Sequence, residues 1–415
     1  MQNTAAGCLL VVTALIVAGC DGQPAPSGGT RPTVTAPADR SGKGATPWLA
    51  GLRMVTPGTG WALAGRSDGY GLSHLVRTTD GGAHWNAIAL PLGLLSPNLV
   101  ATDFHDADHA WIAVALGAES TASREAAVVV STRDGGAHWS VTPRFDVDGM
   151  AMHIQFIDPT HGWVFAGPSA GGAIGSQDTT LYRTVDAGQH WQVSKPSSQV
   201  RGNTAIAGRL PEACPMGGPV GPPTFTNGST GWLGGFCDHP FFYVTHDGGL
   251  SWVAQNLPGF PGPTSGGTSP SYAFDSFQAI TDTDFAVYGH RGFTTGGNAL
   301  QEAAIYVTHD AGASWTAYRL PYAELAAEFV DPIHGWMIGA GSGGDIERRS
   351  LYSTPDGGRS WRLVDGPAGY YAHDLNFVDT TTGFLAVPAT PDSAPELLRT
   401  TDGGATWGGV PAVIN

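Results

Sequence analysis

The stretch Arg77–Trp85, RTTDGGAHW, contains the pattern on which the fold of this chain depends. A threonine stands two residues before Asp80, a glycine two residues after it, and a tryptophan five residues after it. The same spacing recurs as STRDGGAHW, RTVDAGQHW, VTHDGGLSW, VTHDAGASW, STPDGGRSW and RTTDGGATW. The aspartates of the seven copies are Asp80, Asp134, Asp186, Asp247, Asp310, Asp356 and Asp402. A motif that recurs along a whole chain predicts a repeat architecture.

Each copy has the chemistry of a β-hairpin turn. An aspartate can accept hydrogen bonds from backbone N–H groups that follow it, and glycine adopts the positive φ that a tight turn needs. The tryptophan begins the next strand and packs beneath the turn, while the threonine fits the strand before it. We call these seven motifs the Asp corners and expect their aspartates to be structural, not catalytic.

A second motif runs in step with the Asp corners. Phe or Met is followed seven residues later by Trp or Phe, usually after Gly, which is typical of a strand end, a short turn and a strand start. The copies are Met54 to Trp61, Phe104 to Trp111, Phe156 to Trp163, Phe225 to Trp232, Phe329 to Trp336 and Phe377 to Phe384. The fifth copy, Phe277 to Phe285, is off by one residue.

Together the two motifs predict repeats of four strands. Strand A ends at the Phe, strand B starts at the Trp, strand C leads into the Asp corner, and strand D starts at its Trp. Between Gly51 and Asn415 these repeats average about 52 residues, close to the roughly 40–50 residues of blade repeats. We therefore predict an all-β fold, a seven-bladed β-propeller of four-stranded antiparallel blades over residues 48–415.

The Asp corners resemble the Asp-box, also called the bacterial neuraminidase repeat. Combined with F-x-D-x-x-x-G-W, they are similar to the exported propellers related to the photosystem II assembly factor. The resemblance covers nearly all of the chain after its N-terminal segment and implies a scaffold or assembly role. It does not imply the photosynthetic partner, and the arginine-rich face of that factor is not evident here.

The N-terminus carries an export signal. The apolar run from Cys8 to Val17 is too short to span about 30 Å of hydrocarbon, and Val17-Ala18-Gly19-Cys20 resembles the lipobox of bacterial lipoproteins. The resemblance implies a signal peptide over 1–19, acylation of Cys20 and a flexible tether over 20–47. We expect an exported protein, lipid-anchored on the extracytoplasmic face of the bacterial cell membrane. The residues before the apolar run lack Lys and Arg, so an unmodified Cys20 behind an ordinary signal, or a misassigned start codon, stays an alternative.

Two further cysteines, Cys214 and Cys237, belong to the predicted propeller. In an oxidising compartment they can form a disulfide, and closing a loop of about 23 residues stabilises a fold by about 3 kcal/mol. The alternative is two free buried thiols.

Length variation predicts where the chain binds. The A–B and C–D turns share one rim of the propeller and hardly change in length, whereas the B–C and D–A connections on the other rim vary widely. We call this second end the loop rim and expect it, with the mouth of the central channel, to be the binding surface. Its longest segments are Lys195–Pro223, Leu257–Tyr272 and His290–Gln301; insertions without function are the alternative.

A ring of mostly polar residues precedes each Phe or Met of strand A. We expect it to line the channel or a ligand floor, or to form hydrogen bonds between blades. Its members are Arg53, Asp103, Gln155, Thr224, Ser276, Glu328 and Asn376. The stretch His105–His109, HDADH, has residue types that bind metals but reads as a polar A–B turn; we expect neither a metal nor a cofactor.

Composition limits the partners. The net charge of −15 and a total of two lysines, Lys43 and Lys195, disfavour nucleic acid. We expect a monomeric, non-catalytic protein that binds a protein, peptide or glycan and touches the membrane only through its lipid anchor.

The enzymatic alternative is a sialidase-like or other glycoside hydrolase. Sialidases share a propeller and Asp-boxes but carry a Phe/Tyr-Arg-Ile-Pro motif at the first strand, where Leu52–Val55 keeps only the arginine. Tyr318–Pro321 looks similar but follows the fifth Asp corner. Tyr370 and Tyr371 lie near the predicted channel without an adjacent glutamate.

Overall fold

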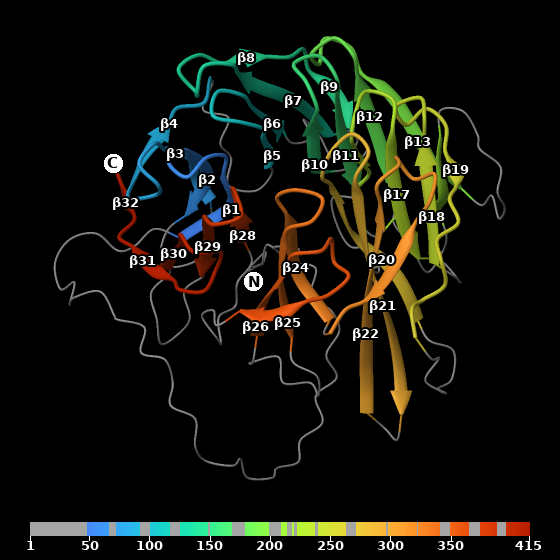
Figure 1. Cartoon of the computed structure of the whole chain (residues 1–415). Coiled ribbons are helices and arrows are strands. Elements are labelled where there is room, and N and C mark those ends of the chain that lie inside the picture. The colour runs from blue at the N-terminus through green and yellow to red at the C-terminus, as the bar shows by residue number, and fades with distance from the viewer. Residues whose placement is uncertain are drawn as a thin grey trace, which may run out of the picture. The chain divides into compact units, whose positions relative to one another are not determined.

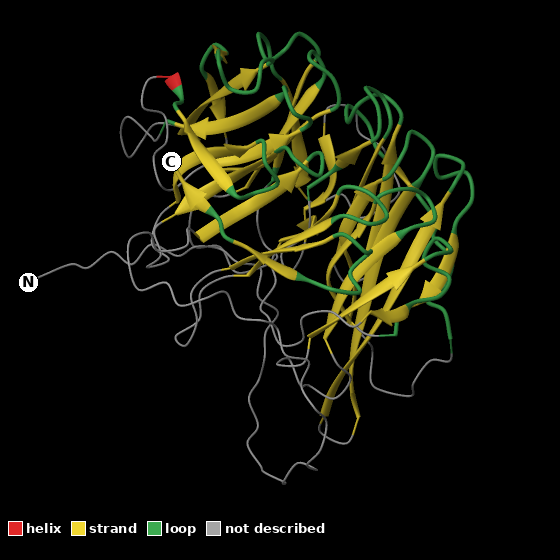
Figure 2. Ribbon diagram, turned by 60° about the vertical axis from the view of Figure 1, so that its left-hand side comes forward, coloured by secondary structure: helices red, strands yellow, loops and turns green. Residues whose placement is uncertain are grey.

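The computed structural model shows the predicted all-β fold (Figures 1 and 2). The structure describes residues 48–65, 72–91, 100–116, 125–147, 150–167, 179–198, 209–213, 218–219, 222–236, 240–262, 271–295, 298–321, 323–340, 349–364, 374–387 and 396–415. Cys20, the signal and tether, and both Cys214 and Cys237 lie outside these residues. Acylation, export and the disulfide therefore stay predictions.

Seven antiparallel sheets follow one another along the chain and confirm the seven-bladed propeller. Blades 1 to 3 consist of β1 (Trp48–Met54), β2 (Gly60–Gly65), β3 (Leu72–Thr78) and β4 (His84–Ile88); β5 (Val100–Phe104), β6 (Ala110–Ala115), β7 (Glu125–Thr132), β8 (Ser140–Val141) and β9 (Phe145–Val147); and β10 (Met150–Phe156), β11 (Gly162–Gly167), β12 (Thr180–Thr184), β13 (Gln192–Ser198) and β14 (Arg209–Ala213).

Blades 4 to 7 repeat the arrangement. They consist of β15 (Gly218–Pro219), β16 (Thr224–Phe225), β17 (Gly231–Phe236), β18 (Pro240–Thr245) and β19 (Val253–Ala254); β20 (Ser271–Ala279), β21 (Phe285–Thr295), β22 (Asn298–Thr308) and β23 (Thr316–Arg319); β24 (Ala323–Phe329), β25 (Gly335–Ala340), β26 (Arg349–Thr354) and β27 (Arg362–Val364); and β28 (Asp374–Phe377), β29 (Gly383–Val387), β30 (Glu396–Thr400) and β31 (Gly408–Val410), followed by β32 (Val413–Ile414).

The described core consists of seven hydrophobic clusters, and each cluster joins two successive blades. One of them joins the last blade to the first, with Phe384 and Ala386 packed with Met54 and Ala62. A row of seven blades has six contacts between neighbours, so the seventh cluster closes the ring. The A strands lie next to one another around the axis, for example β5 beside β10 and β24 beside β28.

Aromatic stacking explains the second sequence motif. At four joints the Phe that ends strand A lies flat on the strand-B Trp of the preceding blade; Trp163 and Phe225, for example, are 3.7 Å apart between ring centroids and 5° from parallel. The indole Nε1 of Trp163 also donates to the carbonyl oxygen of Gly248 in blade 4, at 2.9 Å. Full burial of side chains of this size stabilises a fold by about 1.5–3 kcal/mol each, so this pair holds neighbouring blades together.

In blade 5 the aromatic ring that packs on the preceding blade comes from strand B instead of strand A. In the other six blades the strand-A residue is Phe or, in blade 1, Met54, and the residue paired with it is Gly or, in blade 2, Ala110. A Cβ on Gly162, for example, would lie 2.5 Å from the Phe156 ring. In blade 5 the paired residues are Ala279 and Phe285, so the ring comes from strand B. Phe285 is buried and stacks on Trp232 of blade 4, with centroids 4.2 Å apart. The predicted equivalence of Phe277 is therefore wrong: the register places Ala279 there.

The C-terminus strengthens the closure from outside. Strand β32 pairs in parallel with β4, the outer strand of blade 1, where Ile414 lies opposite Trp85. The N–H of Asn415 donates to the carbonyl oxygen of Trp85 at 2.9 Å. The seam between blades 7 and 1 is therefore held both by a hydrophobic cluster and by an added strand.

The longest B–C connection is a regular ribbon. The sequence predicted a loop from His290 to Gln301, but β21 and β22 pair continuously from Phe285–Thr308 to Thr295–Asn298. Figure 1 shows both strands running well beyond the ends of their neighbours. The predicted loop is thus a β-hairpin extension, which has fewer backbone conformations than a coil of equal length.

Candidate functional site

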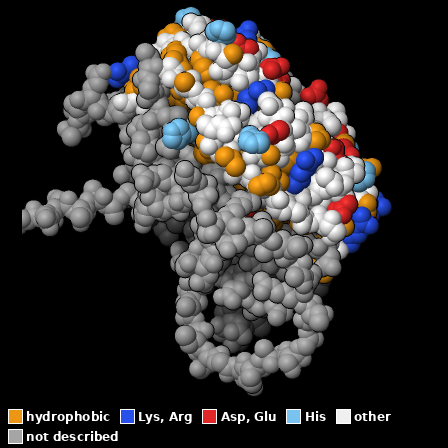
Figure 3. All heavy atoms as spheres, turned by 90° about the vertical axis from the view of Figure 1, so that its left-hand side faces the viewer, with side chains coloured by type: hydrophobic (Ala, Val, Ile, Leu, Met, Phe, Trp, Pro, Cys, Tyr) orange, Lys and Arg blue, Asp and Glu red, His pale blue; other side chains and the backbone are white. Residues whose placement is uncertain are grey.

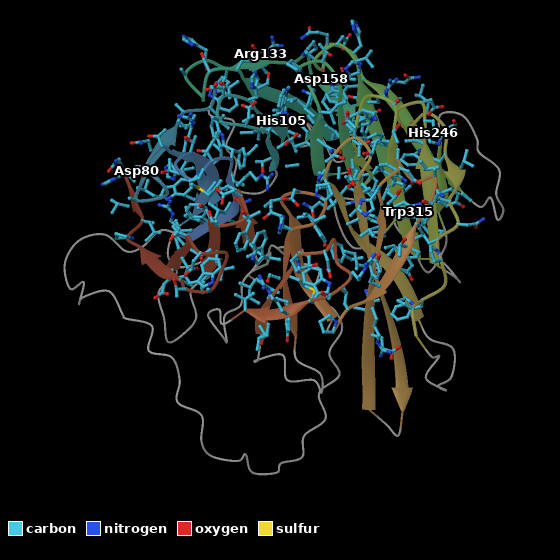
Figure 4. All side chains as sticks on the ribbon, viewed as in Figure 1. Asp80, His105, Arg133, Asp158, His246 and Trp315 are labelled. Atoms are coloured by element: carbon cyan, nitrogen blue, oxygen red, sulfur yellow. The ribbon has the colours of Figure 1, made fainter. Side chains whose placement is uncertain are left out.

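The Asp corners and the A–B turns lock together in every blade. The residue after each corner aspartate donates its N–H to a carbonyl oxygen of the A–B turn in the same blade, at 2.8–3.0 Å. The seven donors are Gly81, Gly135, Ala187, Gly248, Ala311, Gly357 and Gly403. These bonds put both kinds of turn at the same end of each blade, as the sequence predicted; we call this end the corner rim. Figure 4 labels Asp80, Arg133 and Asp158 along it, whereas β21 and β22 extend toward the opposite side of the view.

Inside each Asp corner the aspartate is fully engaged. The preceding threonine donates from Oγ1 to Asp Oδ1 at 2.7–2.9 Å. The same hydroxyl accepts the N–H of the glycine two residues after the aspartate. The residue four after it donates its N–H to Oδ1 and contacts Oδ2 with its side chain, which is His in three corners and a hydroxyl in four.

These bonds keep the corner carboxylates ionised. The N–H of His84 holds the pKa of Asp80 at about 2, and the equivalent bond from His190 does the same for Asp186. At Asp247 burial acts to raise the pKa, but hydrogen bonds from Ser251 and Thr245 outweigh it and the pKa is lowered. A carboxylate with such a low pKa is a poor general acid at neutral pH, so the geometry gives these groups a structural role.

The A–B turns use a second set of polar side chains. Asp106 accepts the N–H groups of Asp108 and His109 at 2.8 and 2.7 Å, and its carboxylate also contacts the His109 ring at 2.9 Å. His109 in turn stacks beside Trp111. Among the described residues no group of three His, Cys, Asp or Glu side chains could hold a metal ion. The HDADH stretch therefore forms a hydrogen-bonded turn.

Five side chains near the axis, four members of the predicted ring and Gln278, bond the next blade. Each accepts the backbone N–H of the strand-A Phe or Met of that blade, and we call these contacts the ring brackets. The pairs are Asp103 with Phe156, Gln155 with Phe225, Gln278 with Phe329, Glu328 with Phe377, and Asn376 with Met54, at 2.6–2.9 Å. These bonds make the contact between blades that the sequence offered as one of two roles, at Asp103, Gln155, Glu328 and Asn376.

The fifth ring position departs from the sequence assignment. Gln278 both donates to the carbonyl oxygen of Phe329 and accepts its N–H, at 2.9 Å each. Gln155 makes the same pair of bonds to Phe225. Ser276 lies two residues before Gln278 on β20 and was predicted in its place. The prediction was wrong because the aromatic residue of this blade is Phe285 on strand B, whereas strand A has Ala279 at the paired position. Thr224 is half-buried at the start of β16.

The Arg53 side chain of blade 1 contacts blade 6, two blades away around the ring. Its Nη1 lies 2.6 Å from Oε1 of Glu328 in blade 6, and its side chain is 50% exposed against 12% for Glu328. Asn376 in blade 7 also donates to Glu328, at 3.1 Å. These contacts join blades 6, 7 and 1 at the axis and add to the closure of the ring.

Two ring carboxyl groups have raised pKa values. Burial raises the pKa of Asp103 to about 6, opposed by the N–H of Phe156 and by the charges of His105 and Arg53. Burial also raises the pKa of Glu328, although Arg53 acts in the opposite direction. Raised carboxyl pKa values are typical of catalytic acids, but both groups occupy positions that Gln or Asn fills in other blades. Their common feature is the bracket, which is a structural contact.

One further titratable group, which the sequence did not single out, lies near the axis. His153 lies on β10, two residues before Gln155, and burial lowers its pKa to about 4. The imidazole is therefore neutral at pH 7. Nothing in the sequence pattern distinguishes it from an ordinary strand residue.

One of the two candidate glycosidase motifs lies within the described residues. Tyr318–Arg319 belongs to β23, an outer strand, where Arg319 pairs with Glu302. Tyr370 and Tyr371 lie outside the described residues. Figure 3 shows Asp, His and Arg side chains interspersed with hydrophobic ones on one described face, without a large patch of a single charge.

The comparisons with known proteins found matches among solved structures. No family model and no curated protein matches the sequence. Among solved structures, YCF48 bound to a D1 peptide is 16% identical, with 86% of this chain and 92% of that chain covered and a TM-score of 0.47. A xyloglucanase from Xanthomonas campestris is 14% identical, with 88% and 55% covered and a TM-score of 0.50. An ulvan lyase is 12% identical, with 88% and 96% covered and a TM-score of 0.46.

These likenesses concern the fold only, because the identities are low and one β-propeller fold serves many functions. The fold and the ring geometry define the chain as a seven-bladed β-propeller closed by hydrogen bonds between blades. Among the described residues no helix is long and apolar enough to cross a membrane.

Proposed function

We propose that this chain is a non-catalytic binding protein of the cell envelope, which holds a protein, peptide or glycan on its loop rim. The observation that carries the proposal is the contrast between the two rims. All seven blades use the same bond between the Asp corner and the A–B turn, so the corner rim is uniform. The connections of the loop rim differ in length from blade to blade, and diverse loops on a rigid scaffold are a common basis of recognition.

The proposal extends to the family and the location. The Asp corners and the F-x-D-x-x-x-G-W pattern support membership of the Asp-box propellers, with a scaffold or assembly role like that of the photosystem II assembly factor relatives. The Cys20 motif supports acylation at the extracytoplasmic face of the cell membrane. Replacing Cys20 with Ser is expected to move the protein from the membrane fraction to the soluble fraction; unchanged fractionation would contradict the anchor.

The state of the polar groups supports binding over catalysis. The corner carboxylates are committed to local hydrogen bonds, and the ring carboxyl groups of Asp103 and Glu328 bond the next blade. A hydrolase needs an acid and a nucleophile or base that are free to reach the substrate. Release of a fluorophore from sialoside or glucoside substrates by the purified protein would overturn the binding proposal.

The binding surface can be tested by crosslinking and recovery from cell envelopes. One variant replaces residues 293–300 with a two-residue turn, and a second shortens the segment 263–270. The matched control, Arg133→Ala, changes an exposed residue of the corner rim. We expect at least a tenfold loss of the recovered partner in one or both loop-rim variants and none in the control. Equal recovery in all three proteins would contradict the assignment.

A further inference from the structure

The ring brackets use two kinds of side chain at equivalent positions. Blades 3, 5 and 7 use the amides of Gln155, Gln278 and Asn376, whereas blades 2 and 6 use the carboxyl groups of Asp103 and Glu328. All five accept the N–H of the next blade's strand-A Phe or Met. An amide stays neutral at every pH, whereas a carboxyl group gains or loses a proton. Two of the five ring brackets therefore contain a titratable group.

The surroundings of the two carboxyl groups differ. Glu328 contacts the guanidinium of Arg53 at 2.6 Å, accepts from Asn376 at 3.1 Å and accepts the N–H of Phe377 at 2.7 Å. Arg53 therefore offsets part of the cost of burying this charge, although burial still leaves the pKa of Glu328 raised. Asp103 accepts the N–H of Phe156 at 2.6 Å, and the charged or titratable groups that act on it are Arg53 on β1 and His105 in its own A–B turn.

Ionisation of a buried carboxyl group costs free energy when no cation contacts it directly. The Asp103 side chain lies at the joint between blades 2 and 3, where Trp111 stacks on Phe156 with centroids 4.8 Å apart. An ionised carboxylate can accept the Phe156 N–H but has no proton to donate, unlike Gln155 in the next bracket. The neutral acid avoids the cost of a buried charge.

We propose that Asp103 makes the joint between blades 2 and 3 proton-sensitive, so that this joint is tighter at mildly acidic pH than at neutral pH. The direction follows from linkage. Burial raises the pKa of Asp103 to about 6, above the value of about 3.9 for an unfolded aspartate. A native state that binds the proton more tightly is stabilised at low pH, and this contribution is lost as the pH rises through about 6.

The test compares three variants of the mature chain by urea unfolding between pH 5 and pH 8. Asp103→Asn keeps a bracket of equal length without the charge, and Gln155→Glu adds a titratable bracket between blades 3 and 4. His105→Gln is the control for the nearby imidazole, because histidine side chains change charge between pH 5 and 8.

We expect the wild-type midpoint to fall between pH 5 and pH 8, the fall to shrink in Asp103→Asn and to grow in Gln155→Glu. The His105→Gln protein should keep most of the wild-type slope. A merely structural role would shift the midpoint equally at every pH, so parallel profiles of wild type and Asp103→Asn would overturn the proposal. If Asp103→Asn does not fold, an unchanged slope in Gln155→Glu would overturn it instead.

Discussion

The corner rim and the loop rim are built from the same strands but by opposite principles. On the corner rim every turn is bonded to the turn beside it, by the N–H after each corner aspartate. On the loop rim the connections range from a paired ribbon, β21 with β22, to an added parallel strand, β14 on β13. Bonding between turns is therefore concentrated at one end of each blade, which leaves the other end free to vary without loss of the fold.

The largest expected effect on stability comes from the aromatic rings that pack between neighbouring blades. Phe156→Ala is expected to lower the free energy of unfolding by about 3–5 kcal/mol, because it removes a buried ring that packs on Trp111. Blade 5 supplies the matched rescue: the double variant Phe156→Ala, Gly162→Phe copies the arrangement of Ala279 and Phe285. We expect the double variant to regain at least half of the loss, measured by urea unfolding. A double variant less stable than Phe156→Ala would show that the two strands are not interchangeable.

The Asp corners give the next largest effect. Asp247→Ala removes the acceptor of the N–H groups of Leu250 and Ser251 and of two hydroxyls. Bonds to a charged group contribute about 1.5–3 kcal/mol, and we expect a loss of about 2–3 kcal/mol in thermal or urea unfolding. The control Asp282→Ala changes an exposed turn residue and should change stability by less than about 0.5 kcal/mol. Equal losses would remove the special role of the corner.

The corner carboxylates and Asp103 near the axis make stability depend on pH in opposite directions. Corner carboxylates such as Asp80 and Asp186 have a folded pKa of about 2, so their contribution is present above about pH 4, the unfolded pKa, and is lost as the pH falls through about 2. Asp103 acts in the opposite direction, with loss as the pH rises through about 6. Since the Asp103 contribution starts to fall above the unfolded pKa of about 3.9, we expect the urea midpoint to be highest between about pH 4 and 5. A maximum above pH 7 would contradict this balance.

The smallest expected effect on stability concerns the loop rim. Replacing residues 293–300 with a two-residue turn removes the far end of the ribbon but leaves the pairing of Phe285–Gly292 with Gln301–Thr308 intact. We expect a change below about 1 kcal/mol in the free energy of unfolding, since the removed backbone pairs only within the ribbon beyond Gly292. A larger loss would mean that the ribbon belongs to the rigid part of the fold.

The sequence predicted the fold class, the blade order and the shared rim of the corners because these depend on local turn chemistry. It missed the fifth blade, where the ring moves from strand A to the residue paired with it on strand B. A one-dimensional motif does not show which residues pair, and so Ser276 and Phe277 were assigned in place of Gln278 and Ala279. The partners of the inner ring depend on contacts between blades more than 40 residues apart, such as Gln155 with Phe225.

Other features were equally outside the reach of spacing. The residue four after each corner aspartate varies between His, Ser and Thr, and only the structure shows that all of them serve the same carboxylate. The pairing of β32 with β4 joins the two ends of the propeller. The short C-terminal stretch PAVIN contains no pattern that predicts this pairing. The regular geometry was thus predictable, and the exceptions to it were not.

The most direct test of the binding surface is site-specific photo-crosslinking in the native cell envelope. A photo-reactive residue at position 295, at the end of the ribbon, is compared with one at position 185, an exposed residue of the third Asp corner. We expect the photo-reactive residue at position 295 to capture a discrete partner and the one at position 185 to capture none. Capture of the same partner at position 185 alone would place recognition on the corner rim and contradict binding at the loop rim.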